Sequence, residues 1–225
     1  MLLRNWTAIF AVTILAACQA SLETDDEIAS YGFGLDIGRS LEPTVTHLDR
    51  AALIRGIEDL LDGLEPAISD ELLVEATQRV GTLVREEQAA EFEAMTETNR
   101  VAGEEYLASN AEKDNVTVTA SGLQYEVVLE GDAGAARPTP ADRVGLHYRG
   151  TLIDGTEFDS SYGGVPAEFG VTQVIPGFSE ALQLMSVGSH YIFTIPSDLA
   201  YGPQGPPDIG PNSTLIFEIE LIEIL

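Results

Sequence analysis

Hydrophobic residues recur at two different spacings along this chain, and the change of spacing divides it into two parts. Up to about Lys113, apolar residues fall three or four positions apart, as Ile28, Tyr31 and Leu35 do, which is the spacing of one helical face. From Asn115 onward, apolar and polar residues alternate, as they do in strands with one buried face. The pattern predicts an α+β protein in which an all-α region precedes a sheet.

Two short helices are predicted at the start of the first part. Acidic residues follow directly after Thr24 and indicate the start of the first helix, because the positive end of a helix dipole favours them. Thr46 and Asp49 resemble a capping box, which places a second helix just after them.

A third helix opens at Ser69 or Asp70 and is predicted to continue without interruption to about Asn110. Its length of about forty residues is far beyond the mean helix of about 11 to 12. Much of the segment is charged or polar, so the helix is expected to bridge rather than to pack.

The two short helices cannot bury a sizeable core alone. We therefore expect residues 18–68 to pair with a second copy of the chain as a homodimer, and a linker helix over 69–114 to hold the C-terminal domain away. Gly34 and Gly38, four positions apart, are suited to close helix packing. The alternative is a monomeric helical bundle that folds against the C-terminal domain.

Residues 115–225 are predicted to form an antiparallel sheet with one short helix that fills its concave face. Strands are expected at Leu123–Glu130, Val144–Leu152, Tyr191–Ile195 and Leu215–Leu221. Asp154-Gly155 is a strong hairpin signal, and Ser179–Met185 is the expected helix.

The first residues have the pattern of an export signal. A short basic start at residues 1–4 precedes an apolar run at residues 6–15. That run is roughly ten residues long and is too short for a bilayer span, which takes about 20. Cys18 is the only cysteine of the chain, so no disulfide is expected within it.

Leu15-Ala16-Ala17-Cys18 resembles the lipobox of bacterial lipoproteins. The resemblance implies a signal peptide of residues 1–17 and lipidation of Cys18, which becomes the new N-terminus. Gln19 is similar to the sorting context of outer-membrane lipoproteins, which implies a periplasm-facing protein anchored to the outer membrane by its lipid. The alternative is a plain secretory signal that ends near Ala20.

Acidic residues dominate the charge of the chain, with 37 acidic against 11 basic residues and a net charge of −26. The basic surface that phosphate-backbone binding requires is missing, so nucleic acid is not an expected partner. His47, His147 and His190 lack the spacing of metal ligands, and Ser160 and Ser161 lack a nucleophile-elbow context. We expect neither a metal nor a cofactor.

Aromatic residues, one carboxylate and turn glycines gather in two short segments of the second part, Thr156–Ser161 and Asp198–Gly202. This mixture is expected where a small sheet lines an apolar pocket with a few fixed polar groups. By composition alone, the aromatic residues are interpreted as sheet core and Asp159-Ser160-Ser161 as a turn. The joint pattern of motifs in this region reverses that interpretation.

Five motifs occur together in the order and spacing of one family. They are Leu146-His147-Tyr148-Arg149-Gly150, the run from Asp154 to Ser161, Gln173-Val174-Ile175-Pro176-Gly177-Phe178, Met185-Ser186-Val187-Gly188 and Ala200-Tyr201-Gly202. From about Ser121 to Leu225 the chain therefore resembles an FKBP-type peptidyl-prolyl isomerase domain, a half-barrel sheet wrapped on a short helix. Ser121 to Tyr125, and Tyr31 to Leu41 with the long helix, also resemble the macrophage infectivity potentiator branch, whose members are dimers joined through helical N-terminal regions.

The resemblance implies a peptidyl-prolyl cis-trans isomerase that assists protein folding in the bacterial envelope. Its substrates would be proline-containing unfolded or folding polypeptides, and macrolides would be its inhibitors. Rotation about an X-Pro bond meets a barrier of about 18–20 kcal/mol and breaks no bond, so a dry apolar pocket that favours the twisted imide is sufficient. The alternative is an envelope chaperone or peptide-binding module with little turnover.

The family's site residues map onto this sequence position by position. The implied catalytic residues are Asp159, Tyr201, Phe158 and Tyr148. The implied substrate-binding residues are Phe169, Val174, Ile175, Phe178, Ile209 and Phe217. Phe178 stands where the family usually has tryptophan, so we expect catalysis to survive with altered ligand affinity.

Overall fold

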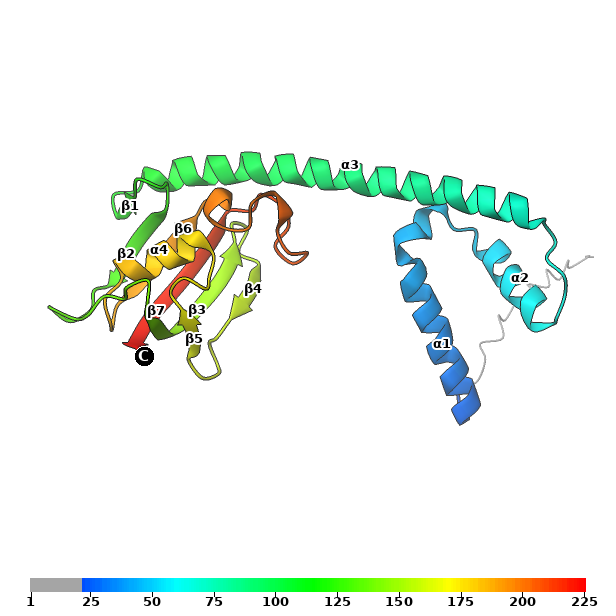
Figure 1. Ribbon diagram of the computed structural model, residues 1–225, viewed down its shortest axis with the longest axis horizontal. Helices are drawn as coiled ribbons and strands as arrows, with labels where there is room; N and C mark the ends of the chain where they lie inside the picture. Colours follow the sequence, from blue (N-terminus) through cyan, green and yellow to red (C-terminus); the bar gives the residue numbers. More distant parts are fainter. Residues whose placement is uncertain (1–21) are drawn as a thin grey trace, which may run out of the picture. The chain divides into compact units, whose positions relative to one another are not determined.

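The computed structural model describes residues 22–225 (Figure 1). The signal peptide predicted over residues 1–17, the lipidation site Cys18 and the sorting residue Gln19 lie outside the described residues. The chain divides into two compact units, Met1–Arg85 and Glu86–Leu225, so the long helix begins in one unit and ends in the other.

The described part of the first unit is helical. It contains α1 (Asp25–Leu41), the 3-10 helix η1 (Glu42–His47) and α2 (Arg50–Leu61). The Thr24 side chain accepts from the backbone N–H of Glu27, and the Glu27 carboxylate accepts from the backbone N–H of Thr24. This capping box confirms the predicted start of the first helix.

The second helix begins differently from the prediction. Asp49 is the N-cap of α2, and its Oδ1 accepts from the backbone N–H of Ala52 at 2.9 Å. Thr46 lies inside η1, so the capping box predicted from Thr46 and Asp49 is wrong. The Asp49 carboxylate alone satisfies a free backbone N–H at the start of α2. Thr46 cannot cap this helix because it belongs to the 3-10 helix η1.

The long helix α3 spans Asp70–Ala111 and contains 42 residues. Ser69 precedes it, and Ser69 Oγ accepts from the backbone N–H of Leu72 at 3.5 Å. The predicted helix from Ser69 or Asp70 to about Asn110 is confirmed.

In the second unit, the described residues form a seven-stranded sheet in the order β1-β2-β6-β7-β3-β4, with β5 also paired to β3. All strand pairs are antiparallel. The strands are β1 (Val116–Val118), β2 (Gln124–Leu129), β3 (Arg143–Leu152), β4 (Glu157–Ser160), β5 (Ala167–Gly170), β6 (His190–Ile195) and β7 (Leu215–Ile224). Because β3 pairs with β4, β5 and β7, side chains from all four strands converge around it.

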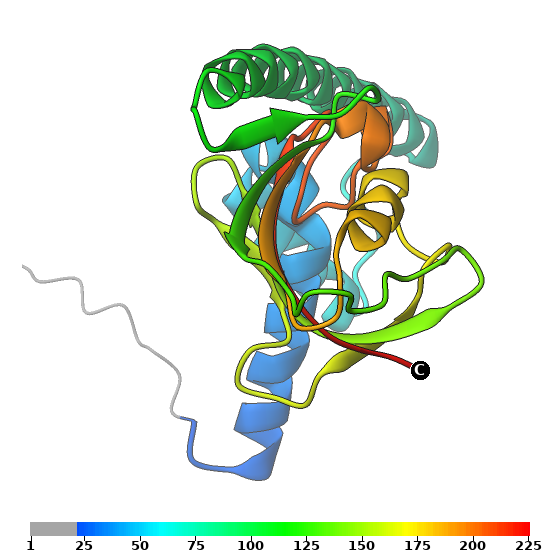
Figure 2. The same cartoon turned by 90° about the vertical axis from the view of Figure 1, so that its left-hand side faces the viewer.

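One short helix, α4 (Pro176–Leu184), lies in the concave face of the curved sheet (Figure 2). Phe178 and Leu182 on α4 are buried in one core with Phe217 and Ile219, which alternate with half-buried residues along β7. The predicted half-barrel sheet wrapped on a short helix is confirmed.

The differences from the predicted sheet concern short elements. α4 begins at Pro176 rather than Ser179, because proline suits the first helical turn, where its missing N–H is not needed. β4 and β5 contain only four residues each, too few to show a strand period in the sequence. Asp159 and Ser160, which composition alone placed in a turn, belong to β4.

Candidate functional site

A cavity of about 470 Å³ lies where β3, β4, β5 and β7 meet the start of α4. Most of its lining is aromatic or aliphatic, with a few polar groups, as is typical of ligand sites. The lining residues are Tyr148, Phe158, Asp159, Phe169, Gln173, Val174, Ile175, Phe178, Tyr201 and Phe217.

Aromatic rings from different elements form the floor and walls of this cavity. Phe178 from α4 packs edge to face against Phe217 from β7, with ring centroids 5.1 Å apart and planes at 85°. Phe158 from β4 packs on Phe217 in the same manner at 5.6 Å, and Phe169 from β5 packs on Phe178 at 6.0 Å. Edge-to-face pairs of this kind stabilise one another beyond simple area burial, so the rings are held in fixed orientations.

Gly150 makes the closest of these ring contacts sterically feasible. It lies on β3, opposite Phe217 of β7 and Asp159 of β4. A Cβ atom at Gly150 would lie 2.6 Å from Phe158 Cζ and 2.9 Å from Phe217 Cε1. A glycine is therefore required for the two rings to meet above this strand.

Tyr148 and Asp159 supply a polar pair at the cavity wall. The Tyr148 hydroxyl group donates to Asp159 Oδ2 at 2.5 Å. Burial, together with the hydrogen bond to the Asp159 carboxylate, raises the pKa of Tyr148 well above its ordinary value. The phenol therefore remains protonated at neutral pH and acts as a hydrogen-bond donor.

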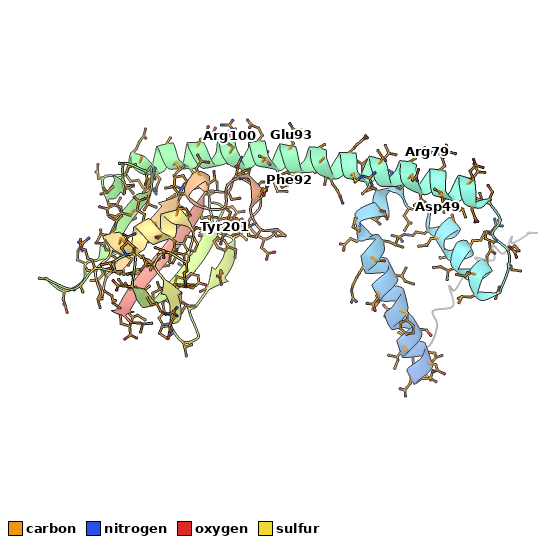
Figure 3. All side chains as sticks on the ribbon, viewed as in Figure 1. Asp49, Arg79, Phe92, Glu93, Arg100 and Tyr201 are labelled. Carbon is orange, nitrogen blue, oxygen red and sulfur yellow. The ribbon has the colours of Figure 1, made fainter. Side chains whose placement is uncertain are left out.

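The remaining groups lie at the mouth of the cavity. Val174 and Ile175 are half-buried, and Ile175 is the N-cap residue of α4. Tyr201 is 43% exposed and lies in the loop between the 3-10 helices η2 (Ser197–Leu199) and η3 (Gly202–Gln204), where Figure 3 labels it. Gly202 has a φ of +61°, a conformation that glycine adopts readily.

The structure brings together every residue of the predicted site except Ile209. Ile209 is buried and lies in the wall of a separate cavity of about 230 Å³, with Asn99 and Leu152. Gln173 was not predicted as a site residue but lines the cavity, and its side chain lies against Gly170. Its place directly before Val174, within one of the five motifs, was the available sequence signal.

Two of the histidines that lack metal-ligand spacing have partners away from the cavity. His147 Nδ1 lies 3.1 Å from Ser161 Oγ and its ring stacks on Tyr162, while His190 Nε2 lies 3.0 Å from Glu218 Oε1. Among residues 22–225, no group of three or more His, Cys, Asp or Glu side chains is arranged to hold a metal ion. The same residues include no helix that is long and apolar enough to cross a membrane.

Comparison with known proteins covers nearly the whole described chain. Residues 134–222 match the family model described as FKBP-type peptidyl-prolyl cis-trans isomerase, and residues 26–127 match the model of the domain amino-terminal to it. The chain is 41% identical to the outer membrane protein MIP of Legionella longbeachae over 217 residues. The aligned region covers 94% of this chain and 91% of that protein.

Two further relatives extend this similarity. The FKBP-type 22 kDa peptidyl-prolyl cis-trans isomerase of Escherichia coli is 45% identical over 208 residues, covering 91% of this chain and 98% of that protein. The crystal structure of FkpA from Escherichia coli superposes with a TM-score of 0.69 at 34% identity, covering 91% of this chain and 98% of that chain.

Proposed function

This chain belongs to the FKBP-type peptidyl-prolyl cis-trans isomerases, and we propose that it uses the aromatic cavity to isomerise X-Pro bonds of polypeptides folding in the bacterial envelope. Isomerase activity follows from the family. The observation that supports this site is the position of one polar pair, Tyr148 and Asp159, in the lining of a cavity that also contains four phenylalanine rings.

The chemistry requires no proton transfer and no covalent intermediate. Resonance between the imide nitrogen and the carbonyl group keeps the X-Pro bond planar and separates charge along it. Twisting the bond removes both effects, so a cavity without water favours the twisted form over the planar one. In this scheme Phe178 is the floor under the proline ring, and Phe158, Phe169 and Phe217 are the walls.

Polar groups at the edge of the cavity hold the flanking peptide. Tyr201 donates its hydroxyl group to a substrate carbonyl, and the backbone N–H of Ile175 donates to another. Asp159 fixes the Tyr148 hydroxyl and lies near the twisting carbonyl, where it acts as an anchor and not as a general base. Each group contributes to the rate only if it binds the twisted form better than the planar one.

An isomerisation assay on a proline-containing peptide tests this assignment. Wild-type protein should accelerate the reaction well above background, and Asp159→Val and Tyr201→Phe should reduce kcat/KM without unfolding the protein. Wild-type activity at background level would contradict the enzymatic role. Suppression of aggregation that persists fully in both variants would support the alternative function, a chaperone whose action does not depend on turnover.

We also propose that the first unit is completed by a second copy of the chain. Along α1 and α2, which are both fully described, not one residue is buried. A groove of about 400 Å³ between these helices is lined by apolar side chains, among them Ile37, Leu41, Val45, Leu53, Ile54 and Ile57. A helical unit without a core of its own is not stable in water, and a homodimer would supply the missing burial.

The proposed location is the periplasmic side of the outer membrane, with the lipid on Cys18 as the anchor. The name of the Legionella relative, an outer membrane protein, supports an envelope location. Replacing Cys18 by Ser should move the protein from the membrane fraction to the soluble periplasmic fraction. A wild-type protein found wholly in the soluble fraction would contradict the lipid anchor.

A further inference from the structure

The C-terminal half of α3 is in direct contact with the loop that follows Tyr201. Asn99, half-buried on α3, donates from Nδ2 to the Pro211 carbonyl oxygen at 2.8 Å and to Ser213 Oγ at 3.3 Å. Figure 1 shows this loop, in orange, next to α3. The loop has a first leg, residues 202–205, and a second leg, residues 209–213. The Asn99 side chain therefore binds the helix to the second leg.

The two legs of this loop are also tied to each other. The backbone N–H of Asn212 donates to the Gly202 carbonyl oxygen at 2.8 Å, directly beside Tyr201. Within the second leg, Ser213 Oγ donates to the Ile209 carbonyl oxygen at 2.6 Å. Gly205 lies so close to the Gly210 carbonyl group that a Cβ atom would not fit between the legs. The two legs of the loop are thus held together.

Burial shows which leg is fixed to the protein. Ile209, Gly210 and Pro211 are buried, whereas the tip from Pro206 to Asp208 is exposed. Asn212 has a φ of +51°, in the left-handed region that asparagine tolerates better than most non-glycine residues, and its backbone N–H bonds to Gly202. The second leg is thus buried and bonded to Asn99. We infer that it fixes the position of the more exposed first leg and of Tyr201.

We propose that Asn99 is a positioning residue for the isomerase reaction. By holding Pro211 and Ser213, it fixes Gly202 through the Asn212 hydrogen bond and so places the Tyr201 hydroxyl group at the mouth of the cavity. The inference rests on the proposed role of Tyr201 in substrate binding.

Asn110 provides a matched control on the same helix. Its Nδ2 donates to Gln124 Oε1 at 2.8 Å and to Thr194 Oγ1 at 3.4 Å, so it binds α3 to strands β2 and β6. It is buried and makes the same kind of contact as Asn99, but its partners lie in the sheet and not in the Tyr201 loop. The two variants therefore separate loop positioning from general attachment of the helix.

The test uses the full chain and a double-mutant cycle. Asn99→Ala and Asn110→Ala are made alone and in the Tyr201→Phe background, and kcat and KM are measured together with the midpoint of urea unfolding. Asn99→Ala should lower kcat/KM by about fivefold, the size expected for one neutral hydrogen bond, and should have no further effect when Tyr201 is Phe. Asn110→Ala should lower the unfolding midpoint and leave kcat/KM unchanged in both backgrounds.

Several results would overturn the inference. One is a loss in Asn99→Ala that adds fully to that of Tyr201→Phe, and another is an equal loss in Asn110→Ala. Unchanged kinetics in Asn99→Ala would also overturn it. If Asn99→Ala does not fold, Asn99→Asp, which keeps the shape but lacks the donor, replaces it in the cycle. Tyr201→Phe alone tests the role of Tyr201, so failure of that role is seen separately from failure of the coupling to Asn99.

Discussion

The hydroxyl group of Tyr148 on β3 donates to Asp159 Oδ2 on the neighbouring strand β4, at 2.5 Å. The pair lies in the wall of the aromatic cavity, where each partner restricts the orientation of the other. Tyr148 also packs edge to face on Phe169 and Phe178, so the hydrogen bond connects the polar edge of the cavity to its apolar floor.

Breaking this hydrogen bond from either side should reduce activity to a similar degree. Tyr148→Phe and Asp159→Val are each expected to lower kcat/KM by about tenfold, since hydrogen bonds to charged groups contribute about 1.5–3 kcal/mol. The double variant should be no worse than either single one. Tyr162→Phe is the control, because it breaks a similar tyrosine–carboxylate bond to Glu220, at 2.8 Å, outside the cavity.

Gly150→Ala should damage the cavity. The added methyl group would collide with Phe158 and Phe217, so we expect a loss of about 1–3 kcal/mol in the free energy of unfolding and most of the isomerase activity. Gly145→Ala on the same strand meets only the Glu223 side chain, at 3.2 Å, and should be tolerated. Equal effects of the two variants in urea unfolding would show that the rings do not need this glycine.

The Phe178 floor should support catalysis while changing ligand affinity. Phe keeps an apolar surface but is smaller than Trp and lacks the indole N–H. Phe178→Trp is therefore expected to change macrolide affinity, measured by titration, more than kcat/KM. A wild-type rate near background that the Trp variant restores would show that the floor residue decides activity.

Alkaline pH should destabilise the second unit. Burial and the hydrogen bond to Glu130 raise the pKa of Tyr191 to about 12, and burial together with carboxylate partners raises the pKa values of Tyr148 and Tyr162 as well. Above pH of about 10 the unfolded chain releases phenolic protons that the folded chain retains, so stability falls as pH rises.

The measurement is the urea midpoint between pH 8 and 11. Lys113 is the only lysine, so few other groups titrate in this range. Tyr191→Phe should make the decline with pH less steep, and a decline identical to that of the wild type would contradict the assignment.

A charge in the groove between α1 and α2 should separate the proposed dimer. Ile54 is 54% exposed in the single chain and would be covered by the partner copy. Ile54→Glu is expected to halve the molecular mass in solution, measured by light scattering, because an unpaired charge is costly to bury. Val128→Glu, at an exposed residue of β2, should not change the mass.

Long periodic elements could be predicted from the sequence, and elements defined by spatial contacts could not. The alternation of Leu215, Phe217 and Ile219 identified β7, and Ser69 marked the start of α3, because both signals are local. β4 and β5 are stabilised mainly by pairing with β3, so their four residues carry little signal of their own.

The candidate site shows the same limit. The family resemblance identified residues that line the cavity, but the positions mapped from it also included Ile209, which lines a different cavity next to α3. Asn99 was not singled out because its partners lie more than one hundred positions away, at separations of 112 and 114 residues. No local pattern distinguishes it from any other polar residue of a long polar helix.

The contact between Asn99 and the loop after Tyr201 also affects where this enzyme can be truncated. The second compact unit begins at Glu86, well before the first strand, and its helical part contacts Pro211, Ser213 and Thr214. A shortened chain that starts at β1 would keep every strand but lose the Asn99 contacts that hold the loop after Tyr201. If Asn99 positions Tyr201 as proposed, a transplantable isomerase module has to include the last turns of the helix that precedes the sheet.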